Sequence, residues 1–334
     1  MNILIVSYAY LPSVGGIERT THVLAQEFRA LGHELTVVSH TPGPEAVEGV
    51  PTIRRPSVGA MLRLVKSHDV VFHFNISLRY GWMMPLLFPR KRWVLKHAGE
   101  PTYTGPTLAS RLKHLAFKRA TNVCPTDFMR RRLGIQAHLI PNPVNPLFRI
   151  LPDNVRDLDC AMVARLVDQK GADIAIEVIA RLRDRNRPTR LELIGSGPEE
   201  AALWKLVVDN GLTDLVTFHG AMEPEEMVPL LNRCRVLLVP SRYDEPFGVV
   251  ALEGAACGLV VVGPTHGGLP EAIGPCGPTL PIRDIDGWAD TVGRLLESEE
   301  ERRPYLEAAP AHLERHRARR IAEAYLRVTA GGAP

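Results

Sequence analysis

The feature that most constrains the fold is a regular alternation, along the whole chain, of short apolar runs with amphipathic helical stretches. In the first half, helical stretches at residues 18–31 and 108–120 lie between the apolar runs. This order is typical of βαβ units, in which crossover helices join parallel strands. The sequence therefore predicts an α/β fold with parallel sheets. The runs predicted as strands in this half are residues 3–7, 34–39, 70–74, 93–97 and 122–125.

A break in the alternation divides the chain. Residues 140–146 read Ile-Pro-Asn-Pro-Val-Asn-Pro, and prolines and asparagines at this density interrupt regular structure. A basic amphipathic stretch at residues 313–328 predicts a long terminal helix with no strand after it. We expect two Rossmann-like domains, residues 1–145 and 146–312, each large enough to bury its own core. The strands predicted for the second domain are residues 159–164, 190–194, 216–218, 236–239 and 259–262.

Composition limits the class of protein. No apolar run approaches the roughly 18 residues of a membrane-spanning helix, and the first residues lack the basic segment of a signal peptide. The five cysteines are scattered and form no Cys-x-x-Cys pair. This pattern favours a reduced, cytoplasmic protein without structural zinc over a disulfide framework.

Charge is distributed unevenly between the two halves. Residues 1–150 contain 19 Lys and Arg against 8 Asp and Glu, so they carry +11, and the remaining residues carry −8. The first half is therefore expected to attract an anionic partner, most simply the inner face of a membrane or a phosphate-bearing acceptor. A solvated surface that attracts the acidic half explains the pattern equally well. The basic clusters are Arg54-Arg55, Arg90-Lys91-Arg92, Lys113, Lys118-Arg119 and Arg130-Arg131-Arg132.

The segment with the clearest chemical content is residues 241–253, which read Ser-Arg-Tyr-Asp-Glu-Pro-Phe-Gly-Val-Val-Ala-Leu-Glu. It joins a predicted strand to a predicted helix, and open α/β sheets bind ligands at such strand ends. The first backbone amides of the helix, near Gly248 and Val249, can bind a diphosphate because they lack intrahelical partners. Glu253 can accept hydrogen bonds from ribose hydroxyls, and Glu245 from hydroxyls of a transferred sugar. These residues suit a nucleotide-sugar donor.

A second segment supplies positive charge. Residues 164–171, Ala-Arg-Leu-Val-Asp-Gln-Lys-Gly, follow a predicted strand. Arg165 can bind two phosphate oxygens and Lys170 adds a compact charge, so together they can stabilise a diphosphate as it leaves the sugar. An Arg and a Lys at this spacing are usually solvated surface, but the presence of Glu245 and Glu253 favours the functional interpretation.

These motifs resemble those of the retaining GT-B glycosyltransferases, most closely glycosyltransferase family 4, also described as glycosyl transferases group 1. The shared patterns are Arg-x-x-x-x-Lys-Gly and two glutamates separated by seven residues, with Phe247 and Gly248 between them. The resemblance covers nearly the whole chain and is more specific in the second half. It implies the GT-B fold, two Rossmann-like domains facing across a cleft, with the helix at about residues 313–329 packed back on the first domain.

The resemblance also implies site residues on other loops. Gly15 and Gly16 correspond to a Gly-Gly loop that reaches toward the donor phosphates, and they depart from the Gly-x-Gly-x-x-Gly pattern of dinucleotide-binding proteins. Gly195 opens a Gly-x-Gly-Pro turn near the nucleotide. His97 falls where these enzymes place an active-site histidine, and His73 is a competing candidate. Weaker candidates are Glu100, His219, Gly267 and Gly268.

The resemblance implies retaining transfer of a hexose-type sugar from a UDP- or GDP-sugar to an acceptor hydroxyl, in the biosynthesis of a cell-surface polysaccharide, glycolipid or related glycoconjugate. No metal or redox cofactor is expected, although residues 157–159 and 284–286 each form the Asp-x-Asp pattern that binds metals in another glycosyltransferase fold. The residues predicted for catalysis are His97, Arg165, Lys170 and Glu245. The residues predicted for donor binding are Gly15, Gly16, Arg165, Lys170, Gly195, Phe247, Gly248, Val249 and Glu253.

Two alternatives remain open. One is another GT-B enzyme acting on nucleotide sugars or sugar phosphates, such as an epimerase or a phosphorylase. The other is a glycosyltransferase-like subunit that binds a partner or a lipid surface without catalysing transfer. It is motivated by the basic first domain, and the four charged residues Arg165, Lys170, Glu245 and Glu253 argue against it.

Overall fold

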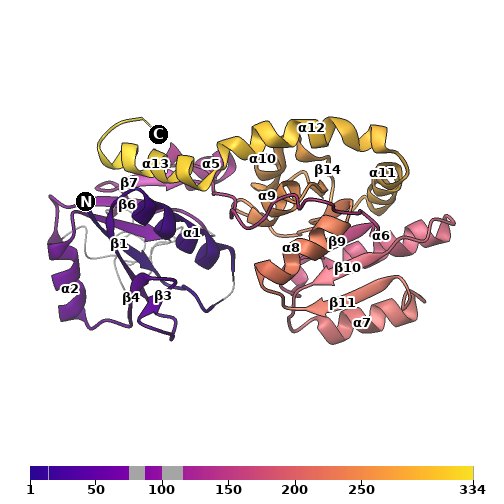
Figure 1. Cartoon of the computed structure of the whole chain (residues 1–334), viewed down its shortest axis with the longest axis horizontal. Coiled ribbons are helices and arrows are strands. Elements are labelled where there is room, and N and C mark those ends of the chain that lie inside the picture. Colours follow the sequence, from indigo (N-terminus) through magenta and orange to yellow (C-terminus); the bar gives the residue numbers. More distant parts are fainter. Residues whose placement is uncertain (14, 75–86, 100–115, 334) are drawn as a thin grey trace. The chain divides into compact units, whose positions relative to one another are not determined.

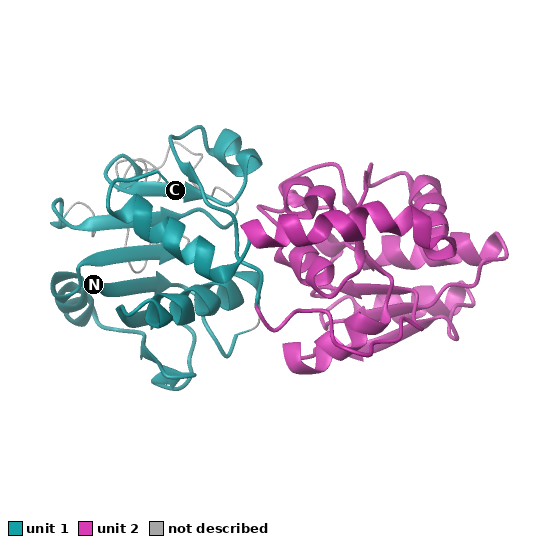
Figure 2. Ribbon diagram, turned by 45° about the horizontal axis from the view of Figure 1, so that its top comes forward, with its two compact units in different colours: residues 1–145, 316–334 teal, residues 146–315 magenta. Residues whose placement is uncertain are grey.

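Both halves of the chain form α/β sandwiches, as the alternation of apolar runs and helical stretches predicts (Figure 1). The computed structural model describes residues 1–13, 15–74, 87–99 and 116–333. The chain divides into two units (Figure 2). Unit 1 comprises Met1–Asn145 with His316–Pro334, and unit 2 comprises Pro146–Arg315.

Unit 1 is built on an eight-stranded sheet of order β3-β4-β2-β1-β5-β6-β7-β8. Its neighbouring strands run parallel, except for the antiparallel pair β3 and β4. The order reverses between β1 and β5, which makes this pair the topological switch point of the sheet. The strands are β1 Asn2–Ser7, β2 Glu34–Ser39, β3 Ala46–Val47, β4 Val50–Arg54, β5 Val70–Phe74, β6 Arg92–Lys96, β7 Thr121–Cys124 and β8 His138–Leu139.

Helices cover both faces of this sheet. On one face, α1 (Gly16–Ala30) and α13 (Ala318–Thr329) enclose a core that includes Phe28, Phe72 and Tyr325. On the other face, α2 (Val58–Ser67) packs its buried side chains against β1, β5 and β6. The short helix α5 (Asp127–Leu133) follows β7. The helix predicted for residues 108–120 lies mostly outside the described residues.

A terminal helix with no strand after it packs on unit 1, as predicted, but it begins at residue 318 and not at the predicted residue 313. Helix α12 (Glu299–Arg315) ends in unit 2, and α13 begins at Ala318 in unit 1. The helix is interrupted because the backbone at the break pairs with residue 144. The Val144 amide donates to the His316 carbonyl at 2.9 Å, and Arg317 forms an isolated parallel bridge with Val144.

Unit 2 contains a six-stranded sheet of order β11-β10-β9-β12-β13-β14, in which every pairing is parallel. The order reverses between β9 and β12, so the loops that follow these two strands flank the switch point. The strands are β9 Cys160–Val163, β10 Leu191–Ile194, β11 Val216–Gly220, β12 Val236–Leu238, β13 Val260–Pro264 and β14 Thr279–Leu280.

The helices of unit 2 bury a core in which Trp288 is fully enclosed. They are α6 Ala172–Asp184, α7 Glu200–Asp209, α8 Pro224–Arg233, α9 Val249–Ala256, α10 Leu269–Ile273, α11 Ile285–Glu297 and α12. Among the helices that the structure describes, none combines the length and apolar character that crossing a bilayer requires.

Candidate functional site

The site residues predicted in the second half of the sequence gather at the carboxyl edge of the unit 2 sheet. Arg165 and Lys170 follow β9, Gly195 follows β10, and Glu245 and Gly248 lie between β12 and α9. In a parallel sheet all of these loops emerge at the same edge, and the switch point between β9 and β12 lies at its centre.

An ion pair joins the two charged motifs. Lys170 Nζ donates to Glu245 Oε1 at 2.7 Å, and the two side chains are 25% and 9% exposed. A carboxylate buried to this degree requires a partner, because desolvation of an unpaired charge is costly. The Lys170 charge is therefore balanced by Glu245 in this structure, and a phosphate bound at Lys170 would share it with that carboxylate.

Hydrogen bonds to one carbonyl hold these two loops together. The Gln169 carbonyl accepts from Ser241 Oγ at 3.1 Å, from the Arg242 amide at 2.9 Å and from the Tyr243 amide at 3.3 Å. Arg242 also forms an ion pair with Asp173 at the start of α6. These contacts place Lys170 against Glu245. Sequence reasoning did not single out Gln169, because a backbone carbonyl leaves no signal in the choice of side chain.

Gly195 has a structural reason to be glycine. Its backbone φ is +135°, and an added Cβ would lie 1.8 Å from the Ala164 carbonyl oxygen. The Gly195 amide donates to the Gly220 carbonyl at 2.7 Å, which joins the ends of β10 and β11. The close approach holds the turn against the β9 loop that carries Arg165. Contact between this turn and a nucleotide remains a prediction.

The amino end of α9 carries no side-chain cap. Gly248 is its N-cap residue, with φ +95°, and has no side chain that could cap the first turn. Uncapped amides at a helix start bind anions well. Phe247 is buried just before this turn, and Glu253 lies partly exposed in the second turn.

The loop between β13 and α10 supports Glu245 from the other side. The Gly268 amide donates to the Glu245 carbonyl at 2.6 Å, and a Cβ on Gly267 would lie 2.9 Å from the Glu245 amide nitrogen. The same loop contains His266, whose Nε2 is buried without a hydrogen-bond partner in the described part of the chain. Sequence reasoning missed His266, since a lone histidine beside two glycines has no distinctive spacing.

Arg165 differs from Lys170 in having no partner within the described ranges. Its side chain is exposed and forms no hydrogen bond or ion pair with the residues that the structure describes. A guanidinium that stays charged at all physiological pH values is thus available at the carboxyl edge of the sheet.

In unit 1, Gly15 is the N-cap residue of α1 and Gly16 is its first residue, after β1 at the switch point of that sheet. The carboxylate of Glu18 covers this turn, because a Cβ on Gly15 would lie 2.5 Å from Glu18 Oε2. Ser13 Oγ donates to the same carboxylate at 3.2 Å. A phosphate at Gly15 and Gly16 would therefore compete with the Glu18 carboxylate for the start of α1.

His97 lies just past the end of β6 and is buried. Its Nε2–H donates to Asn122 Oδ1 at 3.0 Å, and its ring meets the Phe117 ring edge-on with the centroids 5.0 Å apart. Burial lowers the pKa of His97, which keeps the imidazole neutral at pH 7.

The competing candidate His73 lies within β5, and its ring stacks on Trp93. Neither of its ring nitrogens has a hydrogen-bond partner among the described residues, and burial lowers its pKa to about 4. His73 therefore lies in the position of a core residue, which favours His97 as the active-site histidine. Glu100 lies outside the described residues.

The weak candidate His219 and the aspartates of the two Asp-x-Asp patterns all have protein partners. His219 Nε2 lies 2.6 Å from the buried Glu192 Oε2. In the first Asp-x-Asp pattern, both aspartates form ion pairs with arginines, and in the second, Asp284 caps α11 while Asp286 pairs with Arg185. The part of the chain that the structure describes contains no group of three metal-ligating side chains.

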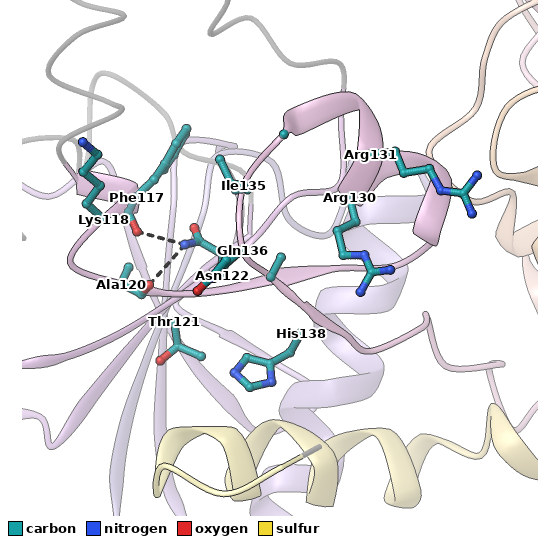
Figure 3. A pocket seen from close by; sticks show the side chains of 12 residues that line it. Phe117, Lys118, Ala120, Thr121, Asn122, Arg130, Arg131, Ile135, Gln136 and His138 are labelled. Carbon is teal, nitrogen blue, oxygen red and sulfur yellow. Dashed lines mark hydrogen bonds between the residues drawn. The ribbon is translucent and has the colours of Figure 1, made fainter.

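A basic cavity of about 1030 Å³ lies at the amino edge of the unit 1 sheet, where β7 and β8 begin (Figure 3). Lys118 lies at one end of it and Arg131 at the other, with Arg130 and His138 between them (Figure 3). Asp127 forms ion pairs with Arg130 and Arg131. The cavity therefore offers positive charge at the edge opposite His97.

Comparisons with known proteins show what the chain is similar to. The model of the family described as glycosyl transferases group 1 matches residues 146–312. The D-inositol 3-phosphate glycosyltransferase of Corynebacterium jeikeium is 35% identical over 45% of this chain and 38% of that protein. The glycogen synthase of Mycobacterium tuberculosis is 26% identical over 89% of this chain and 86% of that protein. The match spans less than half the length of the inositol phosphate glycosyltransferase.

Among solved structures, Anabaena Alr3699/HepE in complex with UDP superposes with a TM-score of 0.84 at 19% identity, covering 99% of this chain and 100% of that one. WaaG, a glycosyltransferase involved in lipopolysaccharide biosynthesis, superposes with a TM-score of 0.76 at 17% identity, covering 98% and 100%. At this level of identity the likeness establishes the fold. The predicted fold class, an α/β protein of the GT-B type with two Rossmann-like domains, is confirmed.

Proposed function

The chain belongs to the glycosyl transferases group 1 family, and on that premise we propose that it transfers a hexose-type sugar from a nucleotide-diphosphate sugar to an acceptor hydroxyl. The observation that carries the proposal is the carboxyl edge of the unit 2 sheet. There the Lys170–Glu245 pair, Arg165, which has no partner among the described residues, and the glycine-capped start of α9 lie on loops around one switch point. We assign the phosphate and sugar groups of the donor to this edge.

The donor proposal assigns the diphosphate to Arg165, Lys170 and the first amides of α9, and the ribose hydroxyls to Glu253. A UDP-sugar is the first donor to test, because Alr3699/HepE, which shares the fold, was solved in complex with UDP. A GDP-sugar is the alternative donor. Gly15, Gly16, Gly195, Phe247 and Val249 complete the proposed donor site.

The Lys170–Glu245 pair suggests how binding of the donor diphosphate frees Glu245 to bind the sugar. When the diphosphate shares the charge of Lys170, the Glu245 carboxylate gives up part of its hydrogen bonding to that ammonium. Its oxygens can then accept hydrogen bonds from the hydroxyls of the sugar. The ion pair thus keeps a nearly buried carboxylate stable until the donor arrives.

We propose a retaining reaction on one face of the sugar. The bond between the anomeric carbon and the phosphate oxygen breaks, the acceptor oxygen bonds to that carbon, and the acceptor proton moves to the leaving phosphate. Arg165 and Lys170 stabilise the negative charge that develops on the diphosphate. This route needs no protein nucleophile, and neutral His97 is assigned to a sugar hydroxyl. A metal and a redox cofactor have no assigned step in this proposal.

The decisive experiment measures binding and turnover together. Calorimetry with UDP- and GDP-sugars identifies the donor, and NMR of the product then reports the configuration of the anomeric carbon. Glu253→Ala should abolish donor binding, whereas Glu177→Ala, which removes an exposed glutamate from α6, should leave it unchanged. Unchanged donor affinity in Glu253→Ala would exclude the assigned role of that residue.

The same product analysis separates the alternatives. An epimerase would convert the donor without an acceptor, and a phosphorylase would require inorganic phosphate. A non-catalytic subunit would bind the donor but turn it over only after a second polypeptide is added. Formation of a glycoside by the purified chain alone excludes all three.

The basic cavity at the amino edge of unit 1 supports a second proposal, peripheral attachment of a cytoplasmic protein to an anionic membrane during glycolipid or polysaccharide synthesis. Lys118, Arg130, Arg131 and His138 line this cavity. Binding should be seen with phosphatidylglycerol vesicles and should fade as salt is raised, because salt screens exposed charges. Equal binding to phosphatidylcholine vesicles would contradict an electrostatic attachment.

A further inference from the structure

Lys96 is a buried amine with no counter-charge among the residues that the structure describes. It is the last residue of β6 and is 3% exposed. Its Nζ lies 5.1 Å from the centroid of the Phe74 ring. With the residues that the structure describes, Lys96 forms no side-chain hydrogen bond and no ion pair. An ammonium in this setting has lost its hydration and gained only the face of one aromatic ring.

The described elements packed against β6 are α2, β5, β7 and α13, and none of them brings a negative charge to Lys96. Burial raises the pKa of Cys124 on β7 to about 12 and raises that of Tyr325 on α13 still further, so both are neutral at pH 7. The adjacent His97 is neutral as well, because burial lowers its pKa. The carboxylate of Glu323 on α13 pairs with Arg319 instead.

Burial alone therefore sets the protonation of this amine, and it lowers the pKa of Lys96 to about 7. An unpaired buried lysine destabilises the fold, whereas an apolar residue at the end of a core strand would not. The position is also one where ligands bind, because β6 ends at the carboxyl edge of the unit 1 sheet, beside β5 and one strand from the switch point.

We propose that Lys96 is the anion-binding residue of a ligand site in unit 1, and that the group it binds is a phosphate. A phosphate supplies the counter-charge that the described surroundings lack, and the compact ammonium suits a phosphate as a point charge. On binding, the neutral fraction of Lys96 takes up a proton from solvent, and the ammonium pairs with the phosphate. The inference concerns unit 1 alone and does not depend on the transfer reaction proposed for unit 2.

The test reads the Lys96 amine directly. The chain contains only seven lysines, so NMR of protein labelled with 13C at the lysine ε-carbons gives a spectrum simple enough to assign. Lys96→Met removes one signal and identifies it, and this variant should fold because it replaces a buried charge with an apolar side chain of similar length. The signal is followed against pH with and without inorganic phosphate, and then with methyl phosphate and with UDP.

Without phosphate, the Lys96 signal should titrate near pH 7. Saturating inorganic phosphate should raise its midpoint by about one pH unit or more, which means that phosphate binds the protonated form about tenfold tighter. Methyl phosphate should act in the same way if the ligand is a phosphorylated acceptor. The exposed Lys205 on α7, which lies in unit 2 outside both proposed sites, serves as the control, and its signal should not move.

Two results would overturn the proposal. One is a midpoint pH of the Lys96 titration that stays the same at every phosphate concentration. The other is a midpoint pH that UDP raises and free phosphate does not, because Lys96 would then bind the nucleotide donor and not a separate phosphate. Lys170→Met separates this test from the proposed function. It should weaken UDP binding and leave the response of Lys96 to phosphate intact, since the signal comes from the Lys96 carbon itself.

Discussion

The Lys170–Glu245 pair allows one prediction to be worked through from geometry. The perturbation is a double-mutant cycle that combines Lys170→Met with Glu245→Gln. Each single change removes one charge of the pair and leaves the other partly buried. The cycle isolates the interaction between the two side chains, because effects that each change has alone cancel out.

The exposure of the two side chains sets the magnitude. Fully exposed ion pairs contribute about 0–1 kcal/mol, whereas removing one partner of a fully buried pair costs about 3–5 kcal/mol. Glu245 is 9% exposed and Lys170 is 25% exposed, and their contact is 2.7 Å. A charge-assisted hydrogen bond between these limits contributes about 2 kcal/mol, so we expect a coupling energy of about 2 kcal/mol in the ligand-free protein.

The assay must report unit 2 by itself, because a chain with two units does not guarantee a single unfolding transition. Hydrogen exchange measured by mass spectrometry in increasing urea meets this need when peptides from β9 and β12 are followed. The matched control is Lys205 with Asp209, an exposed pair on α7 with side chains 74% and 55% exposed. Its coupling should be about 0.3–0.5 kcal/mol.

The double-mutant cycle is then repeated with UDP bound. If a diphosphate shares the charge of Lys170, saturating UDP should reduce the coupling between Lys170 and Glu245 to about half or less. Lys170→Met should also weaken UDP binding by about tenfold to a hundredfold, which corresponds to roughly 1.4–2.8 kcal/mol. A coupling no larger than that of the exposed control pair, or UDP affinity unchanged by Lys170→Met, would refute the reasoning.

Three further predictions concern packing, pH and thiols. A methyl on Gly268 would lie 2.4 Å from the Pro246 carbonyl oxygen. Gly268→Ala should therefore lower the stability of unit 2 by about 1–3 kcal/mol and weaken donor binding. The control is Gly59→Ala in α2, where the added methyl meets no close neighbour, and it should not destabilise unit 1. Folded His73 has a pKa of about 4, below its unfolded value. Its protonation should therefore cost unit 1 about 3 kcal/mol of stability as pH falls from about 6.5 to 4. His73→Leu should reduce the pH dependence measured by urea unfolding by that amount, and the remainder belongs to other groups such as His97. All five cysteines are buried and free, and burial raises the pKa of each thiol. A thiol reagent at about pH 8 should therefore label none of them in the native protein and all of them after denaturation. Fast labelling of the native protein would contradict this prediction.

The sequence alone predicted most of the strands because buried parallel strands are continuous apolar runs. The predictions for residues 34–39 and 70–74 coincide with β2 and β5, and the loops with Arg165 and Glu245 were placed at strand ends from the same pattern. The short strands β3, β8 and β14 escaped, since a pair of residues at a sheet edge has no period to detect.

Long-range contacts decided the rest. The end of α12 depends on a hydrogen bond between residues 144 and 316, and the charge balance of Lys170 depends on a carboxylate 75 residues away. Local sequence describes which side chains are present, but not which of them meet. The isolation of Lys96 is the clearest case, because a lysine at the end of a strand is usually solvated. Only the packing of β5, β7 and α13 around it removes water and leaves its charge unbalanced among the described residues.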